Sequence, residues 1–177
     1  MKNLIIITLL LLTSSPLLAQ QDKFIEDSIE RLENSRKYLL LVADMMPEEK
    51  YGYKVTDESL SFAENLMHIG FALDWHSQSL IGDREARVYQ TDTVFKPANK
   101  TKAEMMARID QTFTEAITLL QDVSPEQLDT ELDYFGLTRS KRQIYMLLAD
   151  HITHHRGQML VYMRLNGLTP PRYVLYQ

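Results

Sequence analysis

The sequence predicts an all-α protein, a single-domain four-helix bundle with a long connection between the second and third helices. Helical apolar periodicity recurs in four long segments, while strand-like alternation is nearly absent. The segment 84–99 lacks that periodicity and is long for a helix–helix loop, and long loops often carry function. At 177 residues the chain fits one domain.

The first two helices are bounded by recognisable end signals. An apolar stripe predicts the first helix over about residues 22–46, and Pro47 ends it. The second helix begins near Ser61, which has capping-box spacing with Glu64, and runs over about residues 61–81. Its apolar residues form two stripes, so we expect it to pack against more than one neighbour.

The second half of the chain shows the same kind of signals. A capping box at Thr101 predicts the start of the third helix. The stretch 124–126 reads as a short extra turn with proline at its first position. The last helix is expected to start near Ser140, with Gln143 in the capping position, and to end at Asn166 and Gly167.

Residues 1–19 have the layout of a secretory signal peptide, so residues 20–177 are the expected mature bundle. A lysine precedes an apolar run over residues 4–12, and Ala19 is the expected last residue before cleavage. That run is too short for a comfortable membrane span, which needs about 20 residues. We therefore expect an exported protein, periplasmic or extracellular, with an uncleaved N-terminal anchor as the alternative. Without cysteine, the chain has no disulfides and no lipid anchor on a thiol.

Composition limits the expected partners. The net charge is −5, with 19 Lys and Arg against 24 Asp and Glu, so nucleic acid is not an expected partner. We expect a small-molecule substrate of unknown identity and no stable membrane span after cleavage. A homodimer is an open alternative to the monomer.

The stretch DHITHHRGQM places three histidines within five positions of the last helix. In steps of three and four, His151 and His155 fall on the seam that should face the core, together with positions such as Gln158, Tyr162 and Leu165, while His154 does not. Residues four apart on a helix have Cβ atoms about 5–6 Å apart, so both imidazoles can reach one ion. The alternative is a pair of core histidines that are hydrogen-bonded to neighbouring groups.

A third ligand has two candidates on the second helix. His68 lies in the middle of that helix and could match the depth of the His151/His155 pair, while His76 lies near its end. Periodicity does not choose between them, but position favours His68, and we expect His76 to be solvated or terminal. Glu64 and Asp150 are the nearest carboxylates in sequence, and a solvated carboxylate is the simpler expectation for each.

Two stretches, ENLMHIGFALDWH and DHITHHRGQMLVYMRLNGLTPP, resemble the DinB-like family of bacterial four-helix-bundle metalloproteins. The resemblance covers the whole mature chain in layout and is sharpest at H-x-x-x-H-R-G-Q. It implies that His68, His151 and His155 bind a divalent ion, with His154 outside the ligand set. It also implies structural roles for the next two residues: Gly157 would allow close helix contact, and Arg156 would pair with a carboxylate.

Three function classes remain open at this point. The first is a metal-dependent hydrolase or thiol-type transferase, since relatives in the wider superfamily are thiol-dependent transferases and isomerases. The second is a metal-binding or structural protein of the envelope without catalysis, and the third is a metal-free helical module that binds a partner. The ion could be zinc, nickel, iron or manganese, and imidazole-rich sites also suit copper. Zincin (H-E-x-x-H) and di-iron (Glu-x-x-His) motifs are both missing from the sequence.

Overall fold

The protein is seen here as a computed structural model, which describes the backbone of residues 2–173 and the side chains of residues 23–173. The described part is dominated by four long helices, as predicted, with short helical turns and one small hairpin between them. The elements in chain order are α1 (Lys2–Met45), η1 (Glu48–Lys50), α2 (Phe62–Asp74), η2 (Trp75–Ile81), α3 (Lys102–Asp122), η3 (Pro125–Asp129), β1 (Glu131–Tyr134), β2 (Leu137–Ser140) and α4 (Lys141–Leu165).

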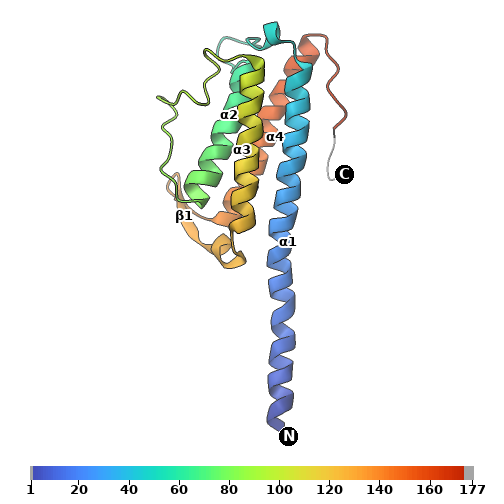
Figure 1. The fold of residues 1–177 in the computed structure, drawn as a ribbon, viewed down its shortest axis with the longest axis vertical. Coiled ribbons are helices and arrows are strands. Elements are labelled where there is room, and N and C mark those ends of the chain that lie inside the picture. The colour runs from blue at the N-terminus through green and yellow to red at the C-terminus, as the bar shows by residue number, and fades with distance from the viewer. Residues whose placement is uncertain (1, 174–177) are drawn as a thin grey trace.

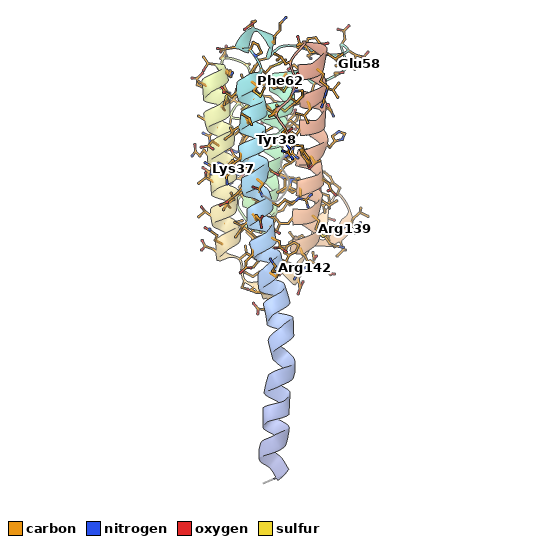
Figure 2. The ribbon with its side chains drawn as sticks, turned by 90° about the vertical axis from the view of Figure 1, so that its right-hand side faces the viewer. Lys37, Tyr38, Glu58, Phe62, Arg139 and Arg142 are labelled. Carbon is orange, nitrogen blue, oxygen red and sulfur yellow. The ribbon has the colours of Figure 1, made fainter. Side chains whose placement is uncertain are left out.

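The helices run up, down, down and up along the bundle axis (Figure 1). α1 packs against α3 and α4, and α2 also packs against α3 and α4. Figure 2 looks onto α1, with α3 on one side of it and α4 on the other. Because α2 and α3 run in the same direction, the chain between them must travel the length of the bundle, which explains the long connection predicted at residues 84–99.

The predicted helix starts are confirmed by their caps. The side-chain oxygens of Ser61, Thr101 and Ser140 each accept from the backbone N–H three residues later, and the side chain at that third position accepts from the backbone N–H of the capping residue. Ser124 forms the same box before η3, which is the short turn expected there. Free amides at the helix ends are thereby satisfied within the local sequence.

A two-stranded antiparallel hairpin, β1–β2, corrects the expectation that strands would be absent. Glu131 pairs with Ser140 and Tyr134 with Leu137, so the turn consists of Phe135 and Gly136 alone. Both turn residues have positive φ, 54° and 78°. The strands are four residues each and show little burial, so they leave no clear alternation in the sequence. The turn also lacks the Asn-Gly or Asp-Gly pair that usually marks such a hairpin.

α1 begins at Lys2 rather than near residue 22, and its N-terminal half projects beyond the bundle (Figure 1). The side chains of residues 1–22 are outside the described set, so the signal peptide over residues 1–19 stays a prediction. Within the described residues, no helix combines the length and hydropathy needed to cross a membrane.

The connection between η2 and α3 is fastened by ion pairs between two aspartates and two arginines. Asp74, at the end of α2, is 3% exposed and forms ion pairs with Arg84 and with Arg87, the latter at 3.3 Å. Arg87 also approaches Asp92 at 3.5 Å, and Asp92 accepts the backbone N–H of Phe95 at 2.7 Å. These contacts fasten the start of the connection to the end of α2 and tie the connection to itself further along.

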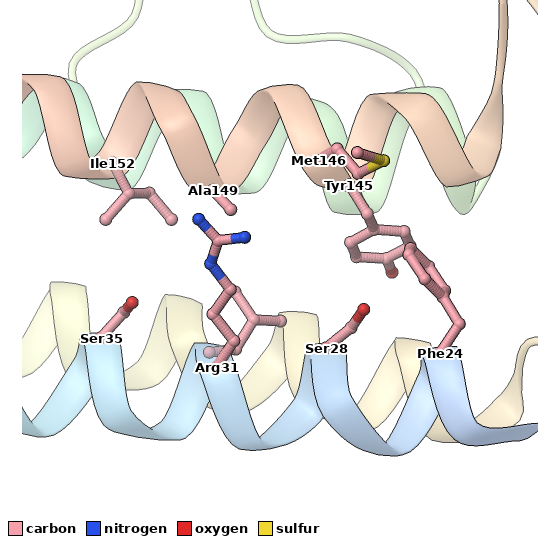
Figure 3. Close-up of a pocket in the computed structure, with 9 residues that line it drawn as sticks. Phe24, Ser28, Arg31, Ser35, Tyr145, Met146, Ala149 and Ile152 are labelled. Carbon is pink, nitrogen blue, oxygen red and sulfur yellow. The ribbon is translucent and has the colours of Figure 1, made fainter. Parts of the chain in front are cut away.

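A cavity of about 50 Å³ lies between α1 and α4, away from the histidines (Figure 3). The Tyr145 hydroxyl is buried beside it and has no hydrogen-bond partner among the described residues, and burial raises its pKa. Arg31 reaches from α1 into the same space. α4 contributes Tyr145, Ala149 and Ile152 to the lining of this cavity.

Candidate metal centre

The structure brings His68, His151 and His155 together between α2 and α4. One nitrogen from each ring lies within 4.8 Å of the corresponding nitrogen of the others. The ring centroid of His68 lies 5.1 Å from that of His151 and 4.5 Å from that of His155. The centroids of His151 and His155, both on α4, are 4.7 Å apart. The three residues that the sequence proposed as ligands therefore form one cluster.

The α4 seam is confirmed over most of its length. Ile144, Leu148 and Tyr162 are buried, and His155 is 8% exposed. Leu165, which the same pattern places in the core, is 55% exposed because it is the last residue of the helix. His154 is exposed, as expected for a residue off the seam, and its Nε2 lies 2.9 Å from the side-chain amide nitrogen of Gln158.

Asn65 is a site residue that the sequence reasoning missed. Its amide nitrogen donates to the backbone carbonyls of Leu60 and Ser61, at 3.1 and 2.9 Å, which leaves its Oδ1 as an acceptor. The Nδ1–H of His155 donates to this oxygen at 2.9 Å, so the lone pair of His155 is on Nε2. An amide one turn before His68 in a largely apolar helix was the signal available in the sequence.

Two of the three imidazoles carry a buried nitrogen that the rest of the described chain does not satisfy. Nδ1 of His68 and Nε2 of His151 have no hydrogen-bond partner among the described residues. Burying such an atom unpaired is costly, and ligation to a metal ion removes that cost. This donor set, three imidazoles with one held by an amide behind it, fits a divalent transition metal.

Burial keeps the cluster neutral. It lowers the pKa of His68 to about 4 and that of His155 to about 3, with smaller contributions from the neighbouring histidines and, for His68, from Lys96. The pKa of His151 is also lowered, first by burial and then by His154. Imidazoles ligate as neutral groups, so the electrostatics hold all three in the form that binds an ion near neutral pH.

The expectation that His76 would be solvated or terminal is wrong, because His76 is only 4% exposed. Its Nδ1 lies 2.6 Å from the carbonyl oxygen of Ala72, so Nδ1–H donates there and Nε2 accepts from the Tyr134 hydroxyl at 3.0 Å. Burial lowers its pKa to about 4. The prediction failed because α2 gives way to the π-helix η2 at Trp75, and the hairpin that supplies Tyr134 was not foreseen. His76 is therefore bonded beside the cluster, with its ring 6.2 Å from that of His151.

The two carboxylates considered from the sequence are occupied elsewhere. Glu64 accepts the Ser61 backbone N–H and lies 3.2 Å from the Lys54 ammonium, and these contacts lower its pKa even though burial opposes them. The Asp150 side chain is 81% exposed and faces Arg31 at 3.7 Å. Neither contact directs a carboxylate toward the histidines.

The expected roles of Arg156 and Gly157 are both wrong. The Arg156 guanidinium is buried over the rings of Tyr38 and Tyr173, at 5.2 and 5.6 Å from their centroids, and it forms no ion pair with a carboxylate of the described residues. Tyr38 lies on α1 (Figure 2) and donates to the carbonyl of Pro171, which fastens the C-terminal segment beside it. A Cβ built at Gly157 would meet no heavy atom of the described chain within 4 Å, so no close helix contact occurs there.

The connection between η2 and α3 forms the outer wall of the cluster. The Tyr89 ring packs edge-on against His68, with centroids 5.6 Å apart, and against Phe71 at 4.9 Å. The Lys96 ammonium lies 3.5 Å from the Tyr89 ring centroid. Since Phe95 is buried next to Lys96, this wall is anchored in the core.

Comparison with known proteins gives a consistent picture. The DinB family model matches residues 20–176. The chain is 28% identical over 132 residues to the uncharacterized protein YjoA of Bacillus subtilis, covering 72% of this chain and 81% of YjoA. That relative carries no assigned activity.

Solved structures show the same fold. A DinB-like protein from Bacillus cereus matches with a TM-score of 0.69 and 24% identity, over 86% of this chain and 97% of the other. YfiT from Bacillus subtilis matches with a TM-score of 0.63 and 14% identity, over 85% and 90% of the two chains. YfiT is described as a probable metal-dependent hydrolase with an unusual four-helix bundle topology.

Proposed function

The chain belongs to the DinB family, and on that premise we propose that it is a divalent-metal-dependent enzyme acting on a small molecule. His68, His151 and His155 would hold the ion, which would be zinc, nickel, iron or manganese. The reaction would be hydrolysis or, as in the wider superfamily, a thiol-type transfer. The description of YfiT as a probable metal-dependent hydrolase supports the first of these.

One observation carries the proposal: three neutral imidazole nitrogens converge within 4.8 Å, and two of the rings hold a buried nitrogen without a partner in the described chain. Three protein ligands leave at least one coordination position open, which is typical of catalytic sites and not of closed structural ones. A bound ion of this kind supplies Lewis acidity and lowers the pKa of a water molecule to near neutrality.

The surrounding residues have distinct tasks in this proposal. Asn65 holds His155 with Nε2 toward the other rings. Tyr89 shields one side of His68, and Tyr134 and His76 form a hydrogen-bonded pair next to His151. Because no described carboxylate contacts the cluster, we expect the ion to be the main source of reactivity.

Metal analysis of the mature protein, purified without a histidine tag, tests the proposal. We expect about one equivalent of a transition metal after incubation with each candidate ion, and its loss in the His151→Ala/His155→Ala double variant. His154→Ala is the matched control, because His154 is adjacent in sequence but exposed. The proposal fails if the wild-type protein takes up no metal, or if His154→Ala loses it as completely as the double variant.

Two further properties are part of the proposal. Turnover assays separate an enzyme from a metal-binding envelope protein. An enzyme is indicated if the metal-loaded protein turns over ester, amide or thiol-transfer substrates and the double variant does not.

Export is supported by the leader-like residues 1–19, and the family match begins at residue 20. The intact mass of protein from the envelope fraction should then correspond to a chain starting near Gln20.

A further inference from the structure

The tip of the β1–β2 hairpin carries an unusual residue. Phe135 has a φ of 54°, a region that favours glycine and asparagine, and the residue is 77% exposed. A bulky residue in this conformation is strained, and an exposed phenyl ring gains little from packing in return. Strain of this kind clusters at functional sites, which makes the position a candidate for ligand contact.

Phe135 is part of an aromatic pair that adjoins the histidine cluster. Its ring lies 5.5 Å from that of Trp75, centroid to centroid, at an interplanar angle of 40°. Trp75 is half-buried at the start of the π-helix η2, and its ring lies 4.9 Å from that of His76. π-helical turns are frequent at functional sites, because they redirect side chains within a helix.

One member of the pair and one member of the cluster, Trp75 and His68, lie on the same continuous helical segment, α2 and η2. Trp75 is seven residues after His68, which returns it to nearly the same face, about 10 Å further along the axis. Tyr134 joins the two regions, because its ring lies 6.0 Å from that of Trp75 and its hydroxyl donates to His76. His76 in turn lies beside His151. Ring-to-ring steps of 4.9 Å from Trp75 to His76 and 6.2 Å from His76 to His151 thus connect the aromatic pair to the cluster.

We propose that Phe135 and Trp75 form a platform that binds an aromatic ring of the substrate, while another group of the same molecule reaches the ion. The substrate class is then a small aromatic compound whose ring is joined by a short linker to the reacting group. This inference rests on the proposed metal-dependent function, because the ion is what would hold the reacting group of the substrate. It adds what the histidines alone do not provide, which is selection by the shape of the substrate.

Hydroxamates test this inference, since their chelating head takes open coordination positions on transition metals. Acetohydroxamate probes the ion alone. Benzohydroxamate, phenylacetohydroxamate and 3-phenylpropionohydroxamate add an aromatic ring at increasing reach, and their cyclohexyl analogues provide rings without a π-face. Binding to zinc-loaded protein is followed by calorimetry and by the fluorescence of Trp75, which is the one tryptophan of the sequence.

We expect at least one phenyl compound to bind about three- to tenfold more tightly than its cyclohexyl analogue, the range given by aromatic pairing. The same compound should change Trp75 fluorescence. Phe135→Asn should abolish that preference and leave acetohydroxamate binding unchanged, whereas Phe135→Tyr should retain it. Leu137→Asn, on the same hairpin and also exposed, is the matched control and should behave as wild type.

Stability separates a binding role from a packing role. Asparagine tolerates positive φ, so Phe135→Asn should melt at or above the wild-type temperature although it has lost the preference. Equal binding of phenyl and cyclohexyl compounds, or a preference that survives Phe135→Asn, would overturn the platform and leave the metal function intact. If acetohydroxamate itself fails to bind zinc-loaded protein, the proposed function fails instead, because no coordination position is open.

Discussion

A single amide determines how His155 presents itself to the cluster. Asn65 Oδ1 accepts the Nδ1–H of His155, and two backbone carbonyls fix the orientation of the amide. Such a partner behind a ligating imidazole sets its tautomer and its ring direction. The role depends on hydrogen-bonding capacity at a position that is fully buried.

We therefore expect Asn65→Leu to weaken zinc binding by about ten- to a hundredfold, because His155 loses the group that orients it. Asn65→Asp keeps an acceptor for Nδ1–H and should lose less affinity. Zinc affinity is measured by competition with a chromophoric chelator. Equal affinity in the leucine variant and the wild type would show that the amide is not needed for ligand orientation.

The three histidines of the cluster could be named from the sequence, but the residues that support them could not. The seam on α4 and the spacing of His151 and His155 are local patterns that a helix preserves. Asn65 and His76 acquire their roles from contacts across the bundle, with His155 and with Tyr134 respectively. A pattern within one helix cannot reveal such a partner on another element.

At the level of elements, two glycines in similar helical positions have opposite surroundings. A Cβ at Gly70 on α2 would lie 2.6 Å from Cδ1 of Ile109 and 2.8 Å from Cε1 of Phe95, so α3 and the long connection approach α2 closely there. A Cβ at Gly157 on α4 would meet nothing in the described chain within 4 Å. One glycine permits packing, and the other only weakens its helix.

The same substitution should therefore have opposite effects at these two positions. Gly157→Ala should raise the free energy of unfolding by about 0.5–1 kcal/mol through helix propensity alone. Gly70→Ala should lower it by about 1 kcal/mol, because overpacking exceeds the propensity gain. Urea denaturation measures both, and limited proteolysis of the Gly70 variant should show faster cleavage within residues 84–99. A stabilised Gly70→Ala variant would contradict the packing seen at α2.

Helix boundaries were predictable where side chains near in sequence define them, as at Ser61 and Thr101. The hairpin and the π-helical segment were not, because neither leaves a distinctive local pattern. β1 and β2 depend on pairing with each other, and the widening of the helix at Trp75 accompanies the burial of His76 against Tyr134.

At the level of the whole molecule, buried neutral histidines couple stability to pH. His68, His76 and His155 have pKa values lowered to about 4, 4 and 3, and that of His151 is lowered as well. In the unfolded chain histidine titrates near 6.5. Below that pH the unfolded state binds more protons than the folded state, so stability decreases as the pH falls from about 6.5 toward 4.

For metal-free protein we expect the free energy of unfolding to decrease steadily over this interval. His76, which is almost fully buried, should contribute up to about 1.4 kcal/mol per pH unit, and the partly exposed His68 and His151 less. Urea denaturation between pH 7 and pH 4.5 measures the slope. The slope should be smaller in His76→Phe, and a profile that does not change with pH would show that these imidazoles protonate without cost in the folded state.

The parallel course of α2 and α3 also bears on the order in which the protein folds. A long connection returns the chain along the bundle between α2 and α3. The helix that carries His68 is therefore separated in sequence from the helix that carries His151 by this connection, by α3 and by the hairpin. Contacts between distant parts of a chain form late, since closing a long loop must come before them. We therefore expect the histidine cluster to assemble on the native side of the folding barrier. An ion bound there would slow unfolding and leave the rate of folding nearly unchanged.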